Sequence, residues 1–257
     1  SKEYSDLTSV VEAINSWRDV TAELEDLEVM MADEDSDDEM RALAEAPQLM
    51  LHYTQTPYSY EMAWDYFEKP WSEAKPTVTY RQLPMLVVDD TTRICQSGAI
   101  IRFIANLTHL KPGDALLLGE VDALFETSQE LFAPLNPTIN FAVGTDFVAK
   151  RENLLEQLAP RLGDLERALA AHPSGPFFFG DAPYYCDFGV FHHVNLAMFL
   201  DINLLDPYPN LTQFISIFQK LDGVREYLGN RPELMDVGTE PKLVIDDIAR
   251  PTGVVDN

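Results

Sequence analysis

Residues 71–84 read WSEAKPTVTYRQLP, and the pair Gln96–Ser97 follows a short distance further along the chain. A proline that enters a strand directly after Gln82-Leu83 favours a cis peptide at Pro84, which turns the preceding backbone groups away from the sheet. The N–H and C=O groups of Leu83 are then free to pair with an extended peptide as an added strand would. This stretch therefore predicts a strand whose edge binds a peptide.

Short apolar runs surround this stretch and alternate between strand and helix signals. They predict, in chain order, a strand at Leu49–Tyr53, a helix at Tyr60–Phe67, strands at Leu83–Val88 and Thr91–Ile94, and an amphipathic helix at Ser97–Leu107. This order indicates an α/β domain over residues 47–110.

Only helical signals follow in the second half of the chain. Apolar residues recur at helical spacing in residues 120–132, 146–171, 187–200 and 210–223, and Pro and Gly separate these runs. We therefore expect an all-helical domain over residues 117–231, followed by a tail over residues 232–257.

Residues 1–46 form a third regime with a strong negative charge. They hold fifteen Asp and Glu against three Lys and Arg, which gives −12 of the chain's net charge of −25. Thin apolar stripes on both sides of the acidic run 33–39 predict a helical hairpin with an acidic turn. Such stripes are too narrow to form a core of their own.

The overall composition excludes several functions. An acidic surface repels phosphate backbones, so nucleic-acid binding is not expected. The two cysteines, Cys95 and Cys186, lie far apart and give neither a disulfide framework nor metal-ligand spacing, so no metal is expected. No apolar run is long enough to span a membrane, and no signal-peptide pattern opens the sequence. We expect a cytoplasmic protein, or equally one of a soluble organelle compartment.

Polar residues around the predicted strand and helix are suited to an acidic peptide. Ser97 at a helix N-terminus offers a hydroxyl, free N–H groups and the helix dipole to a carboxylate. Gln82 and Gln96 supply amide donors and acceptors, and Lys75 offers a positive charge to a second carboxylate. A tripeptide with a carboxylate at each end matches this arrangement.

Taken together, Trp71, Lys75, Gln82-Leu83-Pro84 and Gln96-Ser97 resemble the sigma-like glutathione transferases in identity and spacing. The resemblance implies a thioredoxin-like half, possibly truncated, followed by the helical transferase domain, with glutathione as co-substrate. It also implies a catalytic tyrosine at the end of the first strand, here Tyr53, whose hydroxyl stabilises the thiolate that attacks a small hydrophobic electrophile. A prostaglandin-type isomerase is a further possibility within the same family.

The same resemblance implies that Asp122, on the first helix of the second domain, reaches the glutathione of a neighbouring subunit in a homodimer. Two departures from the family pattern favour a competing hypothesis. The family usually has a Gly-Arg-Ala-Glu segment after its tyrosine, and here only Glu61 of that segment is present. The sequence separation between Tyr53 and Trp71 is also shorter than in the family, as if a segment were trimmed or missing. The alternative to an enzyme is therefore a non-catalytic subunit or scaffold of a larger assembly.

Residues 1–46 resemble a different family, the N-terminal helical domain of class I peptide-chain release factors. The similarity lies in the order and spacing of Val10–Ile14, Met31–Asp35 and Met40–Ala44. The Gly-Gly-Gln motif of such factors is absent, so the resemblance implies a protein-contacting hairpin and no role in translation termination. An unrelated acidic hairpin is the alternative.

Overall fold

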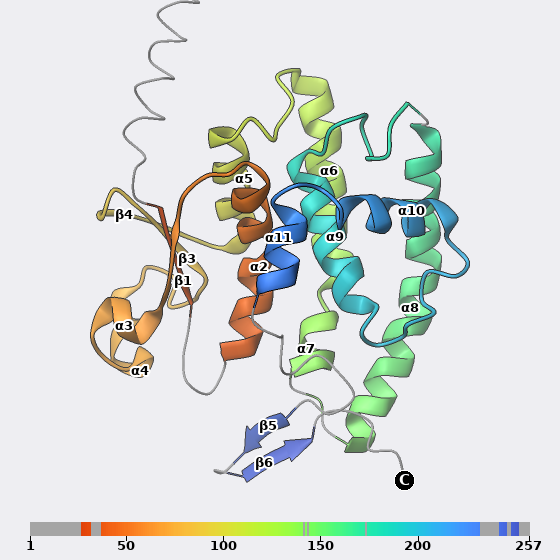
Figure 1. Cartoon of the computed structure of the whole chain (residues 1–257). Coiled ribbons are helices and arrows are strands. Elements are labelled where there is room, and N and C mark those ends of the chain that lie inside the picture. Colours follow the sequence, from red (N-terminus) through yellow and green to blue (C-terminus); the bar gives the residue numbers. More distant parts are fainter. Residues whose placement is uncertain are drawn as a thin grey trace, which may run out of the picture.

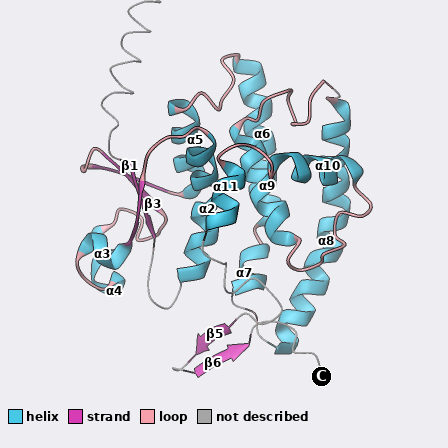
Figure 2. Cartoon of the chain, in the orientation of Figure 1, coloured by secondary structure: helices cyan, strands magenta, loops and turns pink. Residues whose placement is uncertain are grey.

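The chain folds into a small sheet packed against a large set of helices (Figures 1 and 2). The computed structural model describes residues 27–31, 37–140, 142, 144–172, 174–231, 242–245 and 248–251. Within this part of the chain, no helix has both the length and the apolarity that a membrane crossing requires.

The main sheet has four strands in the order β2-β1-β3-β4. Its strands are β1 (Leu27–Met31), β2 (Ser59–Met62), β3 (Met85–Val88) and β4 (Thr92–Cys95). β1 runs parallel to β2 and antiparallel to β3, and β3 pairs antiparallel with β4. The predicted strands that became β3 and β4 are confirmed. The first strand of the sheet lies earlier in the chain than we expected.

The strand predicted at Leu49–Tyr53 is wrong, because these residues form the end of helix α2 (Asp37–Tyr53). Ala44, Leu49, Met50 and Leu51 are buried, so the helix contributes a wide face to the main core. A short apolar run alone does not distinguish a buried helix from a strand. Pro47 lies inside this helix, which continues through it.

This result also corrects the predicted organisation of residues 1–46. β1 belongs to the sheet, so Leu27–Met31 is not part of a helical hairpin, and the expected boundary at residue 46 falls inside α2. Residues 1–26 and 32–36 lie outside the described part of the chain, so the release-factor resemblance and the protein partner that it implies stay predictions. β1, α2 and β2 all precede Trp71, so the short sequence separation between Tyr53 and Trp71 reflects the position of Tyr53 at the end of α2.

A second, smaller core lies on the other face of the sheet. It is covered by α3 (Ala63–Phe67), α4 (Trp71–Ala74) and the 3-10 helix η1 (Lys75–Thr77). Along β3, residues alternate between the two cores: Met85 and Val87 face the smaller one, and Leu86 and Val88 face the larger one. Figure 1 shows α3 and α4 on one side of the sheet and α2 and α5 on the other.

The helical half contains the four predicted helices, with ends that shift by up to five residues, and two short helices that the sequence analysis did not predict. It follows α5 (Ser97–Leu107) and comprises α6 (Ala115–Phe132), α7 (Leu135–Asn140), α8 (Gly144–Ala171), α9 (Tyr185–Ala197), α10 (Pro209–Phe218) and α11 (Val224–Asn230). Its centre is an aromatic cluster in which the ring of Phe218 contacts Phe188, Phe191 and Phe214. The expected tail contains a separate hairpin of β5 (Lys242–Ile245) and β6 (Ile248–Pro251).

The first turn of α9 is anchored by a buried carboxylate. The backbone N–H groups of Phe178 and Tyr184 donate to the two oxygens of Asp187 at 3.0 and 2.9 Å. Burial raises the pKa of Asp187 to about 6, although these hydrogen bonds favour the ionised form. Asp187 therefore joins the loop before α9 to the helix itself.

Candidate functional site

The segment before β3 has the backbone form that the sequence predicts. The Leu83–Pro84 peptide is cis. The registers of β3 with β1 and β4 both begin at Met85, so Leu83 lies outside the described strand pairing. Its side chain is buried in the smaller core, which fixes the backbone next to Gln82. Leu83 thus lies directly before the described strand pairing, next to Gln82 and the cis peptide.

Gln96 joins this segment to the start of α5. Its side-chain Nε2 donates to Oε1 of Gln82 at 2.8 Å. Its backbone has φ 74° and ψ 115°, a conformation that residues with a Cβ rarely adopt. Strained backbone of this kind costs about 1–3 kcal/mol and is concentrated at functional sites. Ser97 is the first residue of α5, so its hydroxyl and the free N–H groups of the helix start lie beside this pair.

Trp71 and Lys75 lie close in sequence but in different environments. Trp71 is 6% exposed and packs against Phe67 with ring centroids 6.2 Å apart, within the smaller core that also contains Leu83. Lys75 begins η1 and is exposed. The structure therefore gives Trp71 a packing role next to the Leu83 segment and leaves the Lys75 ammonium at the surface.

Tyr53 does not lie with the other predicted site residues. Met30 at the end of β1 is opposite Met85, directly after Pro84, whereas the chain after Tyr53 returns to the start of β1, where Ser59 pairs with Glu28. A 17-residue helix is about 25 Å long, and Tyr53 is the last residue of α2. Tyr53 and Pro84 are therefore at opposite ends of the sheet.

The surroundings of Tyr53 are those of a packing residue. Its ring meets Phe188 of α9 edge-on, with centroids 5.5 Å apart, and burial raises its pKa. The true first strand reads Leu-Glu-Val-Met-Met, so its sequence offers neither a hydroxyl nor a thiol. Sequence reasoning missed this strand because the acidic residues on both sides of it indicated a solvated helical hairpin.

Asp122 makes its contacts within the same chain. Arg102 Nε and Tyr185 Oη donate to Asp122 Oδ1 at 2.8 and 2.7 Å. Burial alone raises the pKa of Asp122, but these two hydrogen bonds and the guanidinium charge lower it below its ordinary value. Sequence analysis did not identify Arg102 or Tyr185. The one available signal was a cation in the middle of the otherwise apolar helix 97–107.

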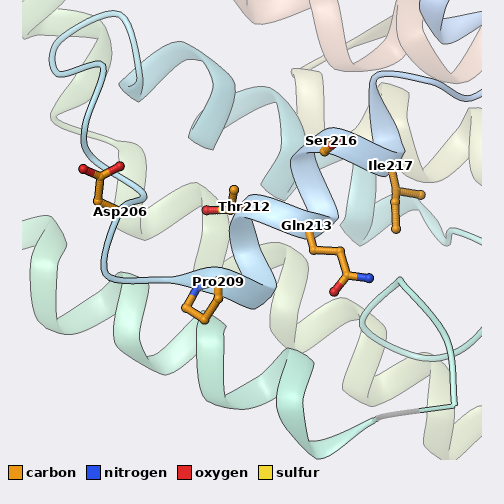
Figure 3. A pocket seen from close by; sticks show the side chains of 6 residues that line it. All are labelled: Asp206, Pro209, Thr212, Gln213, Ser216 and Ile217. Carbon is orange, nitrogen blue, oxygen red and sulfur yellow. The ribbon is translucent and has the colours of Figure 1, made fainter.

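A hollow also lies on the outer face of α10, away from all predicted site residues (Figure 3). Its volume is about 570 Å³, and it is lined by Asp206, Pro209, Thr212, Gln213, Ser216 and Ile217. Among the residues that the structure describes, no cluster of three or more His, Cys, Asp or Glu is arranged to hold a metal ion.

The fold is that of a thioredoxin-like sheet joined to a helical domain, with a candidate peptide site where the sheet meets α5. The family model for the glutathione S-transferase C-terminal domain matches residues 136–231. Glutathione S-transferase P 10 of Caenorhabditis elegans is 30% identical over 172 residues, which cover 66% of this chain and 79% of the relative. Glutathione S-transferase Mu 1 of Macaca fascicularis is 29% identical over 197 residues, covering 74% and 87%.

The structure of the Pi-class glutathione S-transferase of Onchocerca volvulus has the same fold, with a TM-score of 0.68 and 24% identity over 80% of this chain and 93% of that one. The chain belongs to the glutathione S-transferase family. These relatives carry Pi and Mu names, so the sigma-like assignment stays a prediction.

Proposed function

We propose that this chain binds glutathione at the site formed by Leu83, Gln82, Gln96 and Ser97, and that it does not activate the thiol through Tyr53. The observation that carries the proposal is the strained backbone of Gln96, whose side chain is hydrogen-bonded to Gln82. Strain next to a helix N-terminus is retained where it orients groups for a ligand. The relatives, all named glutathione transferases, support glutathione as that ligand.

The chemistry of β1 favours binding without tyrosine-activated conjugation. A free thiol has a pKa of about 8.5 and is mostly protonated at neutral pH, so a transferase needs a donor or a positive charge beside the sulfur. The end of β1 lies opposite Met85 and reads Met30-Met31. Methionine donates no hydrogen bond and carries no charge, so this strand itself supplies no group that favours a thiolate.

The composition of β1 and the position of Tyr53 make the non-catalytic alternative the better supported of the two candidate functions. Conjugation of a hydrophobic electrophile through a tyrosine-bound thiolate requires a tyrosine near Pro84, and Tyr53 is at the opposite end of the sheet. A homodimer, the contribution of Lys75 to a ligand carboxylate and a direct contact between Asp122 and the ligand stay predictions from the family resemblance.

The test is equilibrium dialysis of the full chain with labelled glutathione, followed by turnover of a chromogenic electrophile. Binding should weaken at least tenfold in Ser97→Ala and stay unchanged in Tyr53→Phe and in Arg167→Gln, a surface control on α8. Turnover should stay close to the uncatalysed rate in all of them. Turnover that is fast in the wild type and collapses in Tyr53→Phe would restore the catalytic prediction.

A further inference from the structure

A network of charged and aromatic side chains joins the helix that begins at Ser97 to the helical half of the chain. Arg102 of α5 donates from Nε to Oδ1 of Asp122 at 2.8 Å and also pairs with Glu126, both on α6. Tyr185 of α9 donates to the same Asp122 oxygen at 2.7 Å. Three helices therefore meet at a single carboxylate.

Arg102 and Asp122 are both held in their charged forms by this network. Burial works to lower the pKa of Arg102, but the two carboxylates outweigh it and raise the value. Burial, together with the Asp122 carboxylate, raises the pKa of Tyr185, which keeps its hydroxyl a donor. Arg102 is held by charge-assisted hydrogen bonds, which are the strong kind and orient a planar guanidinium well.

The same guanidinium contacts the first turn of α5. Nη1 of Arg102 donates to the carbonyl oxygen of Gly98 at 3.4 Å, and the guanidinium carbon lies 4.9 Å from the ring centre of Phe125. A Cβ added at Gly98 would lie 3.3 Å from Arg102 Nη1 and 3.6 Å from Phe125. The turn that begins with Ser97 thus rests directly on these two side chains.

We propose that Arg102 and Asp122 are positioning residues for the carboxylate site at Ser97. Asp122 orients Arg102, and Arg102 together with Phe125 fixes the Ser97–Gly98 turn against α6. The inference rests on the proposed glutathione function. It assigns the effect of Asp122 to its own chain, where it acts through Arg102, and not to a contact with the ligand of a neighbouring subunit.

The charges of the network predict the opposite change in glutathione affinity from the one that a positioning role predicts. The network carries one positive and two negative charges, so its net field opposes an anionic ligand at Ser97. If only the field mattered, Asp122→Asn would tighten glutathione binding. A positioning role predicts weaker binding. A direct contact with the ligand also predicts weaker binding, but that loss would persist when Arg102 is absent.

The experiment is a double-mutant cycle on glutathione affinity, measured by calorimetry at 0.15 M salt with Arg102→Gln, Asp122→Asn and the double variant. We expect Arg102→Gln to weaken binding about tenfold and Asp122→Asn about threefold, in the range of measured long-range couplings. The double variant should be no weaker than Arg102→Gln alone. Arg102→Lys keeps the charge without the planar fork, so its affinity should fall between those of the wild type and Arg102→Gln.

Arg167→Gln is the matched control, because it removes one positive charge from an exposed ion pair with Asp164 on α8. Wild-type affinity in Arg102→Gln, tighter binding in Asp122→Asn, or additive losses in the double variant would each overturn the proposal.

Hydrogen exchange of the first turn of α5 separates this proposal from the proposed function. The amide of Ile100, which donates to the carbonyl oxygen of Gln96 at 3.0 Å, should exchange at least tenfold faster in Arg102→Gln than in the wild type and in Arg167→Gln, with or without ligand. A wild type that binds no glutathione would refute the proposed function, while faster exchange in Arg102→Gln would still support positioning of the turn. Unchanged exchange would refute the positioning itself.

Discussion

The ring of Tyr53 packs edge-on against the ring of Phe188, with centroids 5.5 Å apart, and this contact joins the end of α2 to α9. Both residues belong to the main core, which extends from the sheet into the helical half. The contact accounts for an aromatic residue at this position without any role for its hydroxyl in thiol chemistry.

Truncating Tyr53 should therefore affect stability and not ligand binding. Tyr53→Phe retains the ring and should change the free energy of unfolding by less than about 0.5 kcal/mol, whereas Tyr53→Ala should cost about 2 kcal/mol for a half-buried aromatic ring. Urea unfolding measures both. Tyr80→Ala serves as the control, because Tyr80 is 62% exposed. A Tyr53→Phe variant as unstable as Tyr53→Ala would contradict the packing account.

Because the backbone of Gln96 is strained, we expect a glycine at this position to raise stability and to weaken ligand binding. Glycine adopts φ 74° without penalty, so Gln96→Gly should raise the free energy of unfolding by about 1 kcal/mol. The same change removes the hydrogen bond to Gln82 and should weaken glutathione binding several-fold. Thermal unfolding and a binding titration measure the two effects.

Asp90→Gly is the matched control, because Asp90 also has a positive φ, at 56°, but lies in the turn between β3 and β4. It should gain stability with unchanged affinity. If Gln96→Gly binds glutathione as tightly as the wild type, the strain at Gln96 has no part in the site.

A buried ion pair connects the middle of α2 to the end of the helical half. Arg231, directly after α11, pairs with Glu45, and their side chains are 15% and 3% exposed. Removing one partner leaves a buried charge without compensation, so Arg231→Met should lower the free energy of unfolding by about 3–5 kcal/mol.

The double variant Glu45→Gln/Arg231→Met should recover part of this loss, because no net charge stays buried. Arg225→Met breaks the exposed Arg225–Asp222 pair and should cost less than about 0.5 kcal/mol. Equal losses in Arg231→Met and Arg225→Met, measured by urea unfolding, would show that the buried pair contributes no more than a surface contact.

Asp187 predicts a specific pH dependence of stability. Its pKa is raised from 3.8 to about 6 in the folded chain, so between pH 4 and pH 6 the folded state holds a proton that the unfolded state has lost. The free energy of unfolding therefore falls as the pH rises through this window, by about 3 kcal/mol from this group alone.

Other groups titrate in the same range, including His192, whose pKa burial lowers to about 4. The measurement is therefore the difference between wild type and Asp187→Asn, in which these groups cancel. The stability advantage of the wild type over the variant should shrink from pH 4 to pH 6. Parallel curves would mean that the carboxyl group does not titrate differently in the folded state.

The elements that the sequence predicted well are those in which the pattern of apolar and turn residues within the element itself indicates its structure. The helix Ser97–Leu107 was correct at both ends, because its apolar face repeats at helical spacing and Ser97 opens it. The strand after Pro84 was also identified, because a short apolar run follows Gln82-Leu83 and ends at two aspartates.

Elements defined by tertiary contacts could not be found in this way. β1 is a strand because β2 and β3 pair with it on both sides, and local sequence does not reveal these partners. Once β1 was missed, the run at Leu49–Tyr53 took its place, and Tyr53 was assigned to the site. The Asp122–Arg102 contact, between residues far apart on two helices, was invisible for the same reason.

The most direct test of the account is calorimetric titration of the full chain with glutathione at pH 7, in two buffers of different ionisation enthalpy. The difference in observed heat between the buffers gives the number of protons released on binding, which reports formation of a thiolate. The account predicts saturable binding by the wild type, weakened in Ser97→Ala and unchanged in Tyr53→Phe, with no proton release. Absence of binding at millimolar glutathione, or a proton released by the wild type but not by Tyr53→Phe, would contradict it.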